Sequence, residues 1–204
     1  MKLVRKNTNH AEPLSLGKAL DDCRVASSER GKAWLYKKYY GYLMAIVIRY
    51  VKHEMEAEEL VNECFVKVFL KIESFNADIE EDRLEKSFRS WIARIAVNQS
   101  IDFLRSKKQM AMLDDVSEFE LVPHAVYNQS SLEVQDIMKL LEALPDIQRT
   151  IFNMYEIEGF SHDEIANLLQ IPDSTSRTYL TRAKQKLRKL YVEQFETDAT
   201  NYSG

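Results

Sequence analysis

The stretch that decides the fold is SHDEIANLLQIPDSTSRTYLTRAKQKLRKLY, residues 161–191. It begins with Ser161, which Glu164 follows three residues later, the pattern of a capping box at a helix start. Apolar residues at helical spacing then predict a short amphipathic helix ending near Leu169. A short turn follows, and Pro172 suits the first turn of another helix, where no backbone N–H is needed. The stretch therefore predicts two helices joined by a tight turn, the helix-turn-helix arrangement.

The second of these helices, expected from about Ser174 to Tyr191, carries only positive charge. The whole chain has a formal net charge of −4, so this helix is a local basic surface and not part of a general polyanion binder. Its first turns offer short hydroxyls and an arginine, which contact phosphates and base edges. A basic helix that only faces solvent is the alternative, but the capped helix and turn in front favour DNA binding. We expect major-groove contacts from Ser174, Thr175, Arg177, Thr178, Thr181, Arg182, Lys184 and Arg188.

The rest of the chain is also expected to be helical. Its 204 residues include only 5 Gly and 4 Pro, which is few for a protein with many β-turns. Apolar residues recur at helical spacing in 33–50, 60–72 and 88–96, and an earlier helix is expected near 16–25.

A segment without periodicity separates this helical block from the helix-turn-helix. It contains Asp114, Asp115, Glu118 and Glu120 and no Lys or Arg. A patternless run of this length is unusual inside a compact domain, so we interpret it as a flexible acidic linker. The prediction is an all-α chain with two small helical domains. Its parts are an N-terminal extension (1–14), a first domain (15–108), the linker (109–131), a second domain (132–192) and a polar tail (193–204).

No sequence motif indicates metal binding or catalysis. Cys23 and Cys64 are far apart, and no histidine is spaced to complete a zinc site with them. No P-loop, nucleophile elbow or zinc-protease motif occurs, so we expect no metal, no cofactor and no catalytic residue. The longest apolar run, 42–48, is far short of the roughly 20 residues that span a bilayer, and no signal peptide is present. Few cysteines suit a reducing cytoplasm, where we place the protein.

Two groups of residues resemble one protein family. Leu144-Pro145, residues 155–161 (YEIEGFS), Glu164-Ile165-Ala166 and residues 175–184 (TSRTYLTRAK) resemble region 4 of bacterial sigma factors. Residues 58–65 (EELVNECF) resemble region 2.2, and residues 87–98 (SFRSWIARIAVN) and 101–105 (IDFLR) resemble regions 2.3 and 2.4. Both signatures occur in the family's order, and only regions 2 and 4 are present. This is typical of the extracytoplasmic-function (ECF, group 4) subfamily of the sigma-70 family.

The resemblance implies a region 2 helical bundle and a region 4 helix-turn-helix bundle. It implies a sigma factor that binds core RNA polymerase and directs promoter-specific transcription initiation. Region 4 would read the −35 element, and region 2 would read and melt the −10 element. The implied partners are promoter DNA, an anti-sigma factor, the β′ coiled coil of polymerase for region 2 and the β flap for region 4, without membrane insertion.

Reading a melted −10 strand requires aromatic surfaces for stacking and cations along the backbone. The candidate residues are Phe88, Trp91, Arg94, Asn98, Arg105, Lys107 and Lys108. Asn98 stands where the family has a base-reading Asn, and its amide can pair with adenine; the alternative is a capping or surface Asn. Phe88 and Trp91 can instead be core residues, the role we favour for Trp91. The family has a short loop here that cradles a flipped base, whereas residues 76–87 are longer and acidic, which leaves the promoter preference open.

The resemblance also implies a polymerase-docking helix in region 2.2. Its candidate residues are Glu56, Glu58, Glu59, Leu60, Val61, Glu63 and Phe65. An acidic patch around apolar anchors suits a basic partner helix. The alternative is a solvated helix start whose carboxylates interact with the helix dipole.

Two other functions remain open at this point. One is a one-component helix-turn-helix transcriptional regulator with an N-terminal helical sensor domain, which would dimerise on a palindromic site. The other is an adaptor that binds polymerase or a regulator without touching DNA, against which the basic helix argues.

Overall fold

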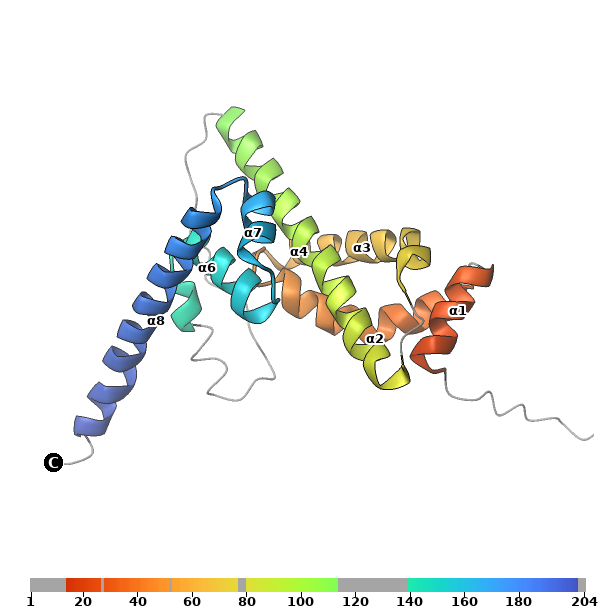
Figure 1. The fold of residues 1–204 in the computed structure, drawn as a ribbon, viewed down its shortest axis with the longest axis horizontal. Helices are drawn as coiled ribbons and strands as arrows, with labels where there is room; N and C mark the ends of the chain where they lie inside the picture. The colour runs from red at the N-terminus through yellow and green to blue at the C-terminus, as the bar shows by residue number, and fades with distance from the viewer. Residues whose placement is uncertain (1–13, 27, 52, 77–79, 114–138, 202–204) are drawn as a thin grey trace, which may run out of the picture.

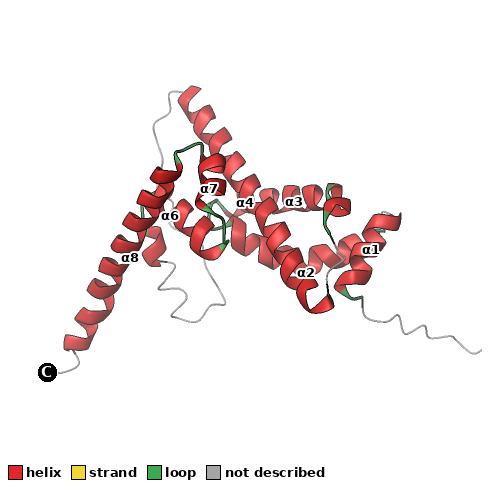
Figure 2. Cartoon of the chain, viewed as in Figure 1, coloured by secondary structure: helices red, strands yellow, loops and turns green. Residues whose placement is uncertain are grey.

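The computed structural model describes residues 14–26, 28–51, 53–76, 80–113 and 139–201 as two groups of helices that lie side by side (Figure 1). Within these residues all regular structure is helical, which confirms the all-α prediction (Figure 2). The N-terminal extension up to residue 13 and the acidic side chains of the predicted linker lie outside the described residues, as do residues 132–138 of the predicted second domain.

Four long helices make up the first group. They are α1 (Leu16–Ala26), α2 (Glu29–Val47), α3 (Glu54–Leu70) and α4 (Glu81–Leu113), with one 3-10 turn, η1 (Ile72–Ser74), between the last two. Residues three or four apart on each helix face a shared core. The core includes Leu35, Tyr39 and Leu43 from α2, Val61, Cys64 and Val68 from α3, and Phe88, Ile92 and Ala96 from α4.

Helices α1 and α2 approach each other closely at Gly31. A Cβ atom at this position would lie 2.8 Å from the backbone oxygen of Ala19 and 2.9 Å from the Cβ atom of Asp22. Only glycine fits this distance without a shift of α1. The close approach fixes where the middle of α1 lies against α2.

The second group contains α6 (Asp146–Phe152), a π-helical turn η2 (Asn153–Ile157), α7 (His162–Leu169) and α8 (Asp173–Asn201). Gly159, with a φ of 73°, allows the chain to reverse between η2 and α7. The side chains of Ile151 from α6, Met154 from η2, Ile165 from α7 and Leu180 from α8 are buried.

Two predicted boundaries were wrong. The acidic loop expected at 76–87 is shorter, because α4 already begins at Glu81. Residues 81–87 contain neither Gly nor Pro, and their acids interact favourably with the positive end of the helix dipole. The polar tail expected from residue 193 continues α8 as far as Asn201, since no Gly or Pro interrupts the helix there.

Candidate nucleic-acid interface

The helix-turn-helix is built around the predicted capping box. The hydroxyl of Ser161 accepts a hydrogen bond from the N–H of Glu164, and the Glu164 carboxylate accepts one from the N–H of Ser161. Helix α7 ends at Gln170 with a φ of 54°, and Pro172 caps the start of α8. We expected Pro172 in the first turn of this helix, whereas it lies one position before α8 begins at Asp173.

A buried hydrogen bond links the two helices of the motif. The Nδ1 atom of His162 lies 2.9 Å from the hydroxyl oxygen of Ser176, and both residues are buried. The ring of His162 also stacks on Tyr155, with 4.4 Å between the ring centroids. The hydrogen bond between His162 and Ser176 fixes the angle at which α8 leaves the turn. The sequence analysis assigned no role to these two residues.

The residues predicted to contact the −35 element share the outer side of α8. Ser176, Leu180, Ala183 and Leu187 face inward, so residues offset from them face solvent. The exposed predicted residues are Ser174, Arg177, Thr178, Thr181, Arg182, Lys184 and Arg188, and Thr175 is half-buried.

Two of these cations are engaged within the domain. Arg177 pairs with Asp173 at 2.9 Å, which raises the pKa of its already basic guanidinium, and Lys184 pairs with Glu156 of η2 at 2.6 Å. Both pairs lie at the surface, where exchange for phosphate contacts costs little.

An open groove with a volume of about 690 Å³ runs along the N-terminal half of α4. It is lined by Ser74, Phe75, Asn76, Arg83, Lys86, Ser87, Ser90, Trp91 and Arg94. The groove combines an aromatic surface with three cations, the combination that binds single-stranded nucleic acid. Trp91 and Arg94 were predicted to bind the −10 element, whereas the sequence analysis missed Arg83, Lys86 and Ser87. Arg83, Ser87 and Trp91 are spaced four residues apart, and Lys86 follows Arg83 by three, so helical spacing was the signal that could have revealed them.

Two aromatic rings, those of Phe75 and Trp91, line this groove, and the ring of Phe88 packs against both. The centroid of Phe75 lies 5.2 Å from that of Trp91 and 5.3 Å from that of Phe88. Phe88 is only 1% exposed, so the prediction that it contacts DNA is wrong and its role is to support the other two rings. Trp91 is half-buried and lines the groove, so its role is not confined to the core.

The remaining −10 candidates lie farther along α4. Asn98 is exposed, Arg105 is 3.5 Å from Asp102, and Lys107 pairs with Glu56 of α3 at 2.8 Å. None of them lines the groove. The side chain of Lys108 lies outside the described residues.

The acidic residue Glu85, next to Lys86 of the groove, does not line the groove and is bound by three donors. Glu85 accepts hydrogen bonds from Lys38 at 2.8 Å, Tyr39 at 2.9 Å and Arg89 at 3.0 Å. Burial raises the pKa of the Glu85 carboxyl, but these three donors outweigh that effect and hold the pKa below its ordinary value. The charge of Glu85 is therefore balanced within the protein, and this carboxylate is not expected to repel the phosphates of a DNA strand in the groove.

Helix α3 shows only part of the predicted polymerase surface. Glu58, Glu59 and Glu63 are exposed and Glu56 is half-buried. The predicted apolar anchors Leu60, Val61 and Phe65 are 4%, 0% and 3% exposed. They belong to the core and cannot contact a partner, so this prediction was wrong. The large exposed apolar side chains on α3 are Met55, Val66 and Leu70, which the sequence analysis missed.

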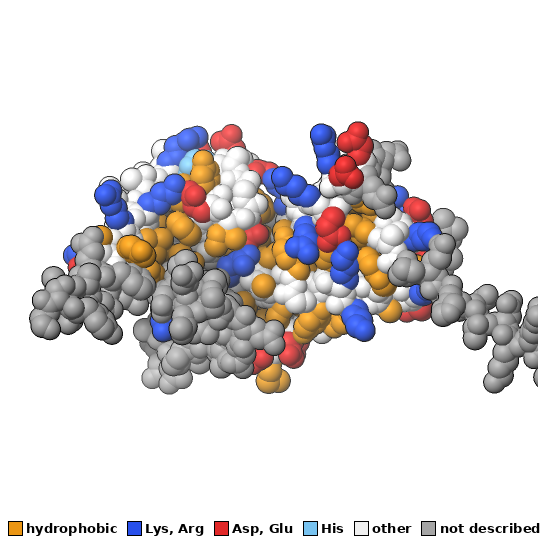
Figure 3. Space-filling model, turned by 90° about the horizontal axis from the view of Figure 1, so that it is seen from below, with side chains coloured by type: hydrophobic (Ala, Val, Ile, Leu, Met, Phe, Trp, Pro, Cys, Tyr) orange, Lys and Arg blue, Asp and Glu red, His pale blue; other side chains and the backbone are white. Residues whose placement is uncertain are grey.

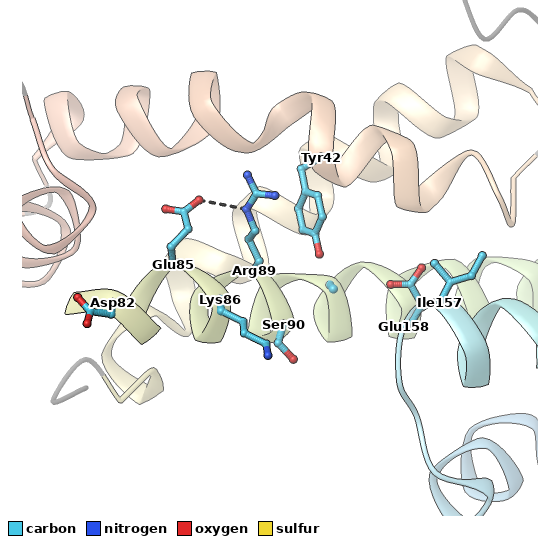
Figure 4. Close-up of a pocket in the computed structure, with 9 residues that line it drawn as sticks. Tyr42, Asp82, Glu85, Lys86, Arg89, Ser90, Ile157 and Glu158 are labelled. Carbon is cyan, nitrogen blue, oxygen red and sulfur yellow. Dashed lines mark hydrogen bonds and ion pairs between the residues drawn. The ribbon is translucent and has the colours of Figure 1, made fainter. Parts of the chain in front are cut away.

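The two domains are in direct contact. Arg49, just after α2, forms an ion pair with Glu158, and their side chains are 13% and 4% exposed. Arg94 forms a second, more exposed pair with Glu164 and lies 4.8 Å above the ring of Phe160. A cavity beside the first pair brings Tyr42 and Arg89 near Ile157 and Glu158 (Figure 4). Arg94 thus joins the groove along α4 to the capping box of the helix-turn-helix.

Opposite charges are interspersed on the face of the molecule shown in Figure 3. Among the described residues, no cluster of His, Cys, Asp and Glu could hold a metal ion. None of the helices in the described part of the chain combines the length and apolar character that crossing a bilayer requires.

Comparison with known proteins gives a consistent result. Residues 35–110 match the family model "Sigma-70 region 2", and residues 134–187 match "Sigma-70, region 4". The ECF RNA polymerase sigma factor SigW of Bacillus subtilis is 30% identical over 163 residues, which cover 74% of this chain and 83% of SigW. The RNA polymerase sigma-H factor of Pseudomonas aeruginosa is 28% identical over 167 residues, 76% of this chain and 83% of that protein. A solved structure of the sigma factor RpoE in complex with the anti-sigma factor NepR, from Bartonella quintana, has a similar fold. Its TM-score is 0.55 at 23% identity, with 80% of this chain and 97% of that chain covered.

Proposed function

Because the chain belongs to the extracytoplasmic-function sigma factors of bacterial RNA polymerase and so directs transcription initiation, we propose that its two domains divide promoter recognition between them. The proposed region 2 domain spans 15–108 and the proposed region 4 domain spans 132–192. The observation that carries the proposal is the row of exposed hydroxyl and basic side chains along α8, directly behind a capped helix and turn.

Region 4 reads the −35 element with this row. The exposed guanidinium of Arg182 can donate two hydrogen bonds to guanine, and the hydroxyls of Thr178 and Thr181 can contact phosphates or base edges. Both hydroxyls donate to the carbonyls of Ser174 and Arg177. In this arrangement they can accept from a base amino group, and they must give up these bonds to donate to a phosphate oxygen. Ser174, Thr175, Lys184 and Arg188 complete the surface.

Region 2 holds a base of the melted −10 strand in the groove along α4. Trp91 offers a half-buried ring for stacking, and Arg83, Lys86 and Arg94 supply cations for the strand's phosphates. Phe88 supports Trp91 from below. Asn98, Arg105, Lys107 and Lys108 bind the strand beyond the groove.

Core polymerase docks on α3. The exposed carboxylates of Glu58, Glu59 and Glu63 precede the exposed side chains of Val66 and Leu70 along α3, and this mixture suits a basic, partly apolar helix such as the β′ coiled coil. The β flap is the proposed partner of region 4.

We further propose that the polymerase supplies all the chemistry and that this chain, acting in the cytoplasm, has no catalytic site of its own. An anti-sigma factor is the proposed regulatory partner, by analogy with the complex of RpoE with NepR.

The decisive experiment is transcription in vitro with added core polymerase and a library of promoters randomised at the −35 and −10 elements. The expected result is a set of transcripts that depends on the protein and shares one sequence at each element. A footprint on a palindromic site without polymerase, together with no protein-dependent transcript, would overturn the proposal in favour of a one-component regulator.

A further inference from the structure

The side chain of Arg24 links α1 to the entrance of the −10 groove. Arg24 lies in the last turn of α1, and its Nη2 atom donates a hydrogen bond to the carbonyl oxygen of Phe75, 51 residues away. The contact is partly buried, and the Nε atom of Arg24 is buried with no hydrogen-bond partner among the described residues. Because a guanidinium stays charged and is costly to desolvate, a residue that only filled space here would be expected to be apolar.

The carbonyl that Arg24 binds belongs to the residue that shapes one end of the groove. Phe75 follows η1 with an extended backbone (φ −75°, ψ 121°), and its ring contacts both Phe88 and Trp91. The next residue, Asn76, lines the groove itself. The position of the Phe75 peptide therefore determines both the ring beside Trp91 and the course of the wall next to it.

Two further hydrogen bonds in the turn before Phe75 are local. The N–H of Phe75 donates to the carbonyl of Ile72 at 3.3 Å, and the hydroxyl of Ser74 donates to the carbonyl of Lys71 at 2.7 Å. These bonds shape the turn but do not fix its distance from another helix. Arg24 supplies that link, and the close approach at Gly31 holds α1 in place to supply it.

We propose that Arg24 is a positioning residue for −10 recognition: it holds the Phe75 peptide so that the groove wall faces Trp91, and it tunes base selectivity without touching DNA. The inference rests on the proposed function of the groove. A lysine at position 24 would keep the charge but lose the planar set of donors, so it would hold the peptide less firmly.

The test compares Arg24→Met and Arg24→Lys with Arg30→Met, a matched control at an exposed arginine in the first turn of α2. Each full-length variant is combined with core polymerase and transcribes promoters that differ by one base, either in the −10 or in the −35 element. We expect Arg24→Met to reduce the discrimination between −10 bases by about 3- to 10-fold, the effect of losing about one hydrogen bond. Discrimination at the −35 element should not change, Arg24→Lys should be intermediate, and Arg30→Met should match the wild type.

Three results would overturn parts of this scheme in distinguishable ways. If Arg24→Met lowers transcription from every promoter by the same factor, or keeps the wild-type −10 discrimination, Arg24 has only a structural role. If Arg24→Met fails to fold, as shown by its circular dichroism, unchanged −10 discrimination by Arg24→Lys would refute the inference. If the wild type itself does not discriminate between −10 bases, the proposed function of the groove fails, and this inference fails with it.

Discussion

The two candidate DNA surfaces differ in how far their residues are already engaged within the protein. On α8 the predicted contacts stand on the outer side of a single helix. Arg182 and Arg188 are exposed, and Arg177 and Lys184 form only surface ion pairs within their own domain. In region 2, by contrast, Phe88 is part of the core and Arg94 is paired with Glu164 of the other domain. The side chains proposed to read duplex DNA on α8 therefore take no part in the core. The surface proposed to hold a melted strand shares its residues with the core and with the domain interface, so DNA must displace protein contacts there.

The largest effect is expected when the side chain of Phe88 is removed. Because its side chain is 1% exposed and contacts Tyr39, Phe75 and Trp91, Phe88→Ala should lower the free energy of unfolding by about 3–5 kcal/mol. Chemical denaturation followed by circular dichroism measures this loss. Trp91→Ala is the control, since it should destabilise less and selectively reduce −10-dependent transcription. A Phe88→Ala protein of wild-type stability that has lost only −10 recognition would show that Phe88 contacts DNA after all.

The second largest effect is expected at the pair between Arg49 and Glu158. Glu158→Gln leaves the Arg49 guanidinium in a nearly buried site without its counter-charge, which costs up to about 3 kcal/mol. Separation of the domains would return Arg49 to water, so the variant should favour a more open molecule. Spin labels or dyes on cysteines introduced at the exposed positions Lys37 and Gln185 should then report longer distances.

This experiment has a matched control and selective labelling. Glu156→Gln removes a carboxylate whose partner, Lys184, lies within the same domain, so its distance distribution should equal that of the wild type. Burial raises the pKa of the native Cys64 thiol to about 12 and also raises that of Cys23, so both react slowly compared with the introduced cysteines. An unchanged distance in Glu158→Gln would mean that this pair does not hold the domains together.

Local patterns in the sequence were enough to predict the helices and the row of hydroxyl and basic side chains on the outer side of α8. The capping box of Ser161 and Glu164 depends on residues three positions apart, and the basic face of α8 depends only on helical spacing. Leu60, Val61 and Phe65 were misassigned for a related reason. The apolar period that predicts a helix also marks the side that becomes buried, so apolar residues at that spacing belong to the core even where exposed carboxylates stand next to them.

Contacts between distant segments could not be predicted from a single sequence. The ion pair of Arg49 with Glu158 joins residues 109 positions apart, and Arg24 reaches Phe75 across 51. No periodicity relates such positions. The three donors around Glu85 likewise come from two different helices, so the sequence suggested an acidic loop where the structure has a neutralised carboxylate.

A smaller effect should distinguish base contacts from phosphate contacts on α8. Arg182→Ala should weaken binding of the polymerase complex to its preferred −35 element by about 1–3 kcal/mol if Arg182 reads a guanine. Promoters without that guanine should be unaffected, as measured by competition between promoter fragments. An equal loss on every promoter, with a shallower dependence on salt, would instead identify Arg182 as a phosphate contact.

The smallest effect concerns the pair between Arg94 and Glu164, which is about 40% exposed on both sides and is expected to contribute less than about 1 kcal/mol. The Arg94 guanidinium and the Ser161 N–H lower the pKa of the Glu164 carboxyl below its ordinary value. A carboxyl with a lowered pKa in the folded state stabilises that state at every pH above its unfolded value, near 4.3. This contribution is lost as the pH falls through the lower, folded value.

The distance between labels at Lys37 and Gln185 should therefore stay constant from neutral pH to about pH 5 and lengthen slightly below about pH 4. Glu164→Gln should remove this acid-dependent component, because the amide does not titrate in this range, although it still offers an oxygen to the N–H of Ser161. Lengthening that begins near neutral pH, or that persists unchanged in Glu164→Gln, would assign the opening to other groups. In that case the pair of Arg94 with Glu164 would not hold the domains together, and Arg94 could exchange Glu164 for the −10 strand without opening the molecule, so the two DNA surfaces would differ less than their contacts indicate.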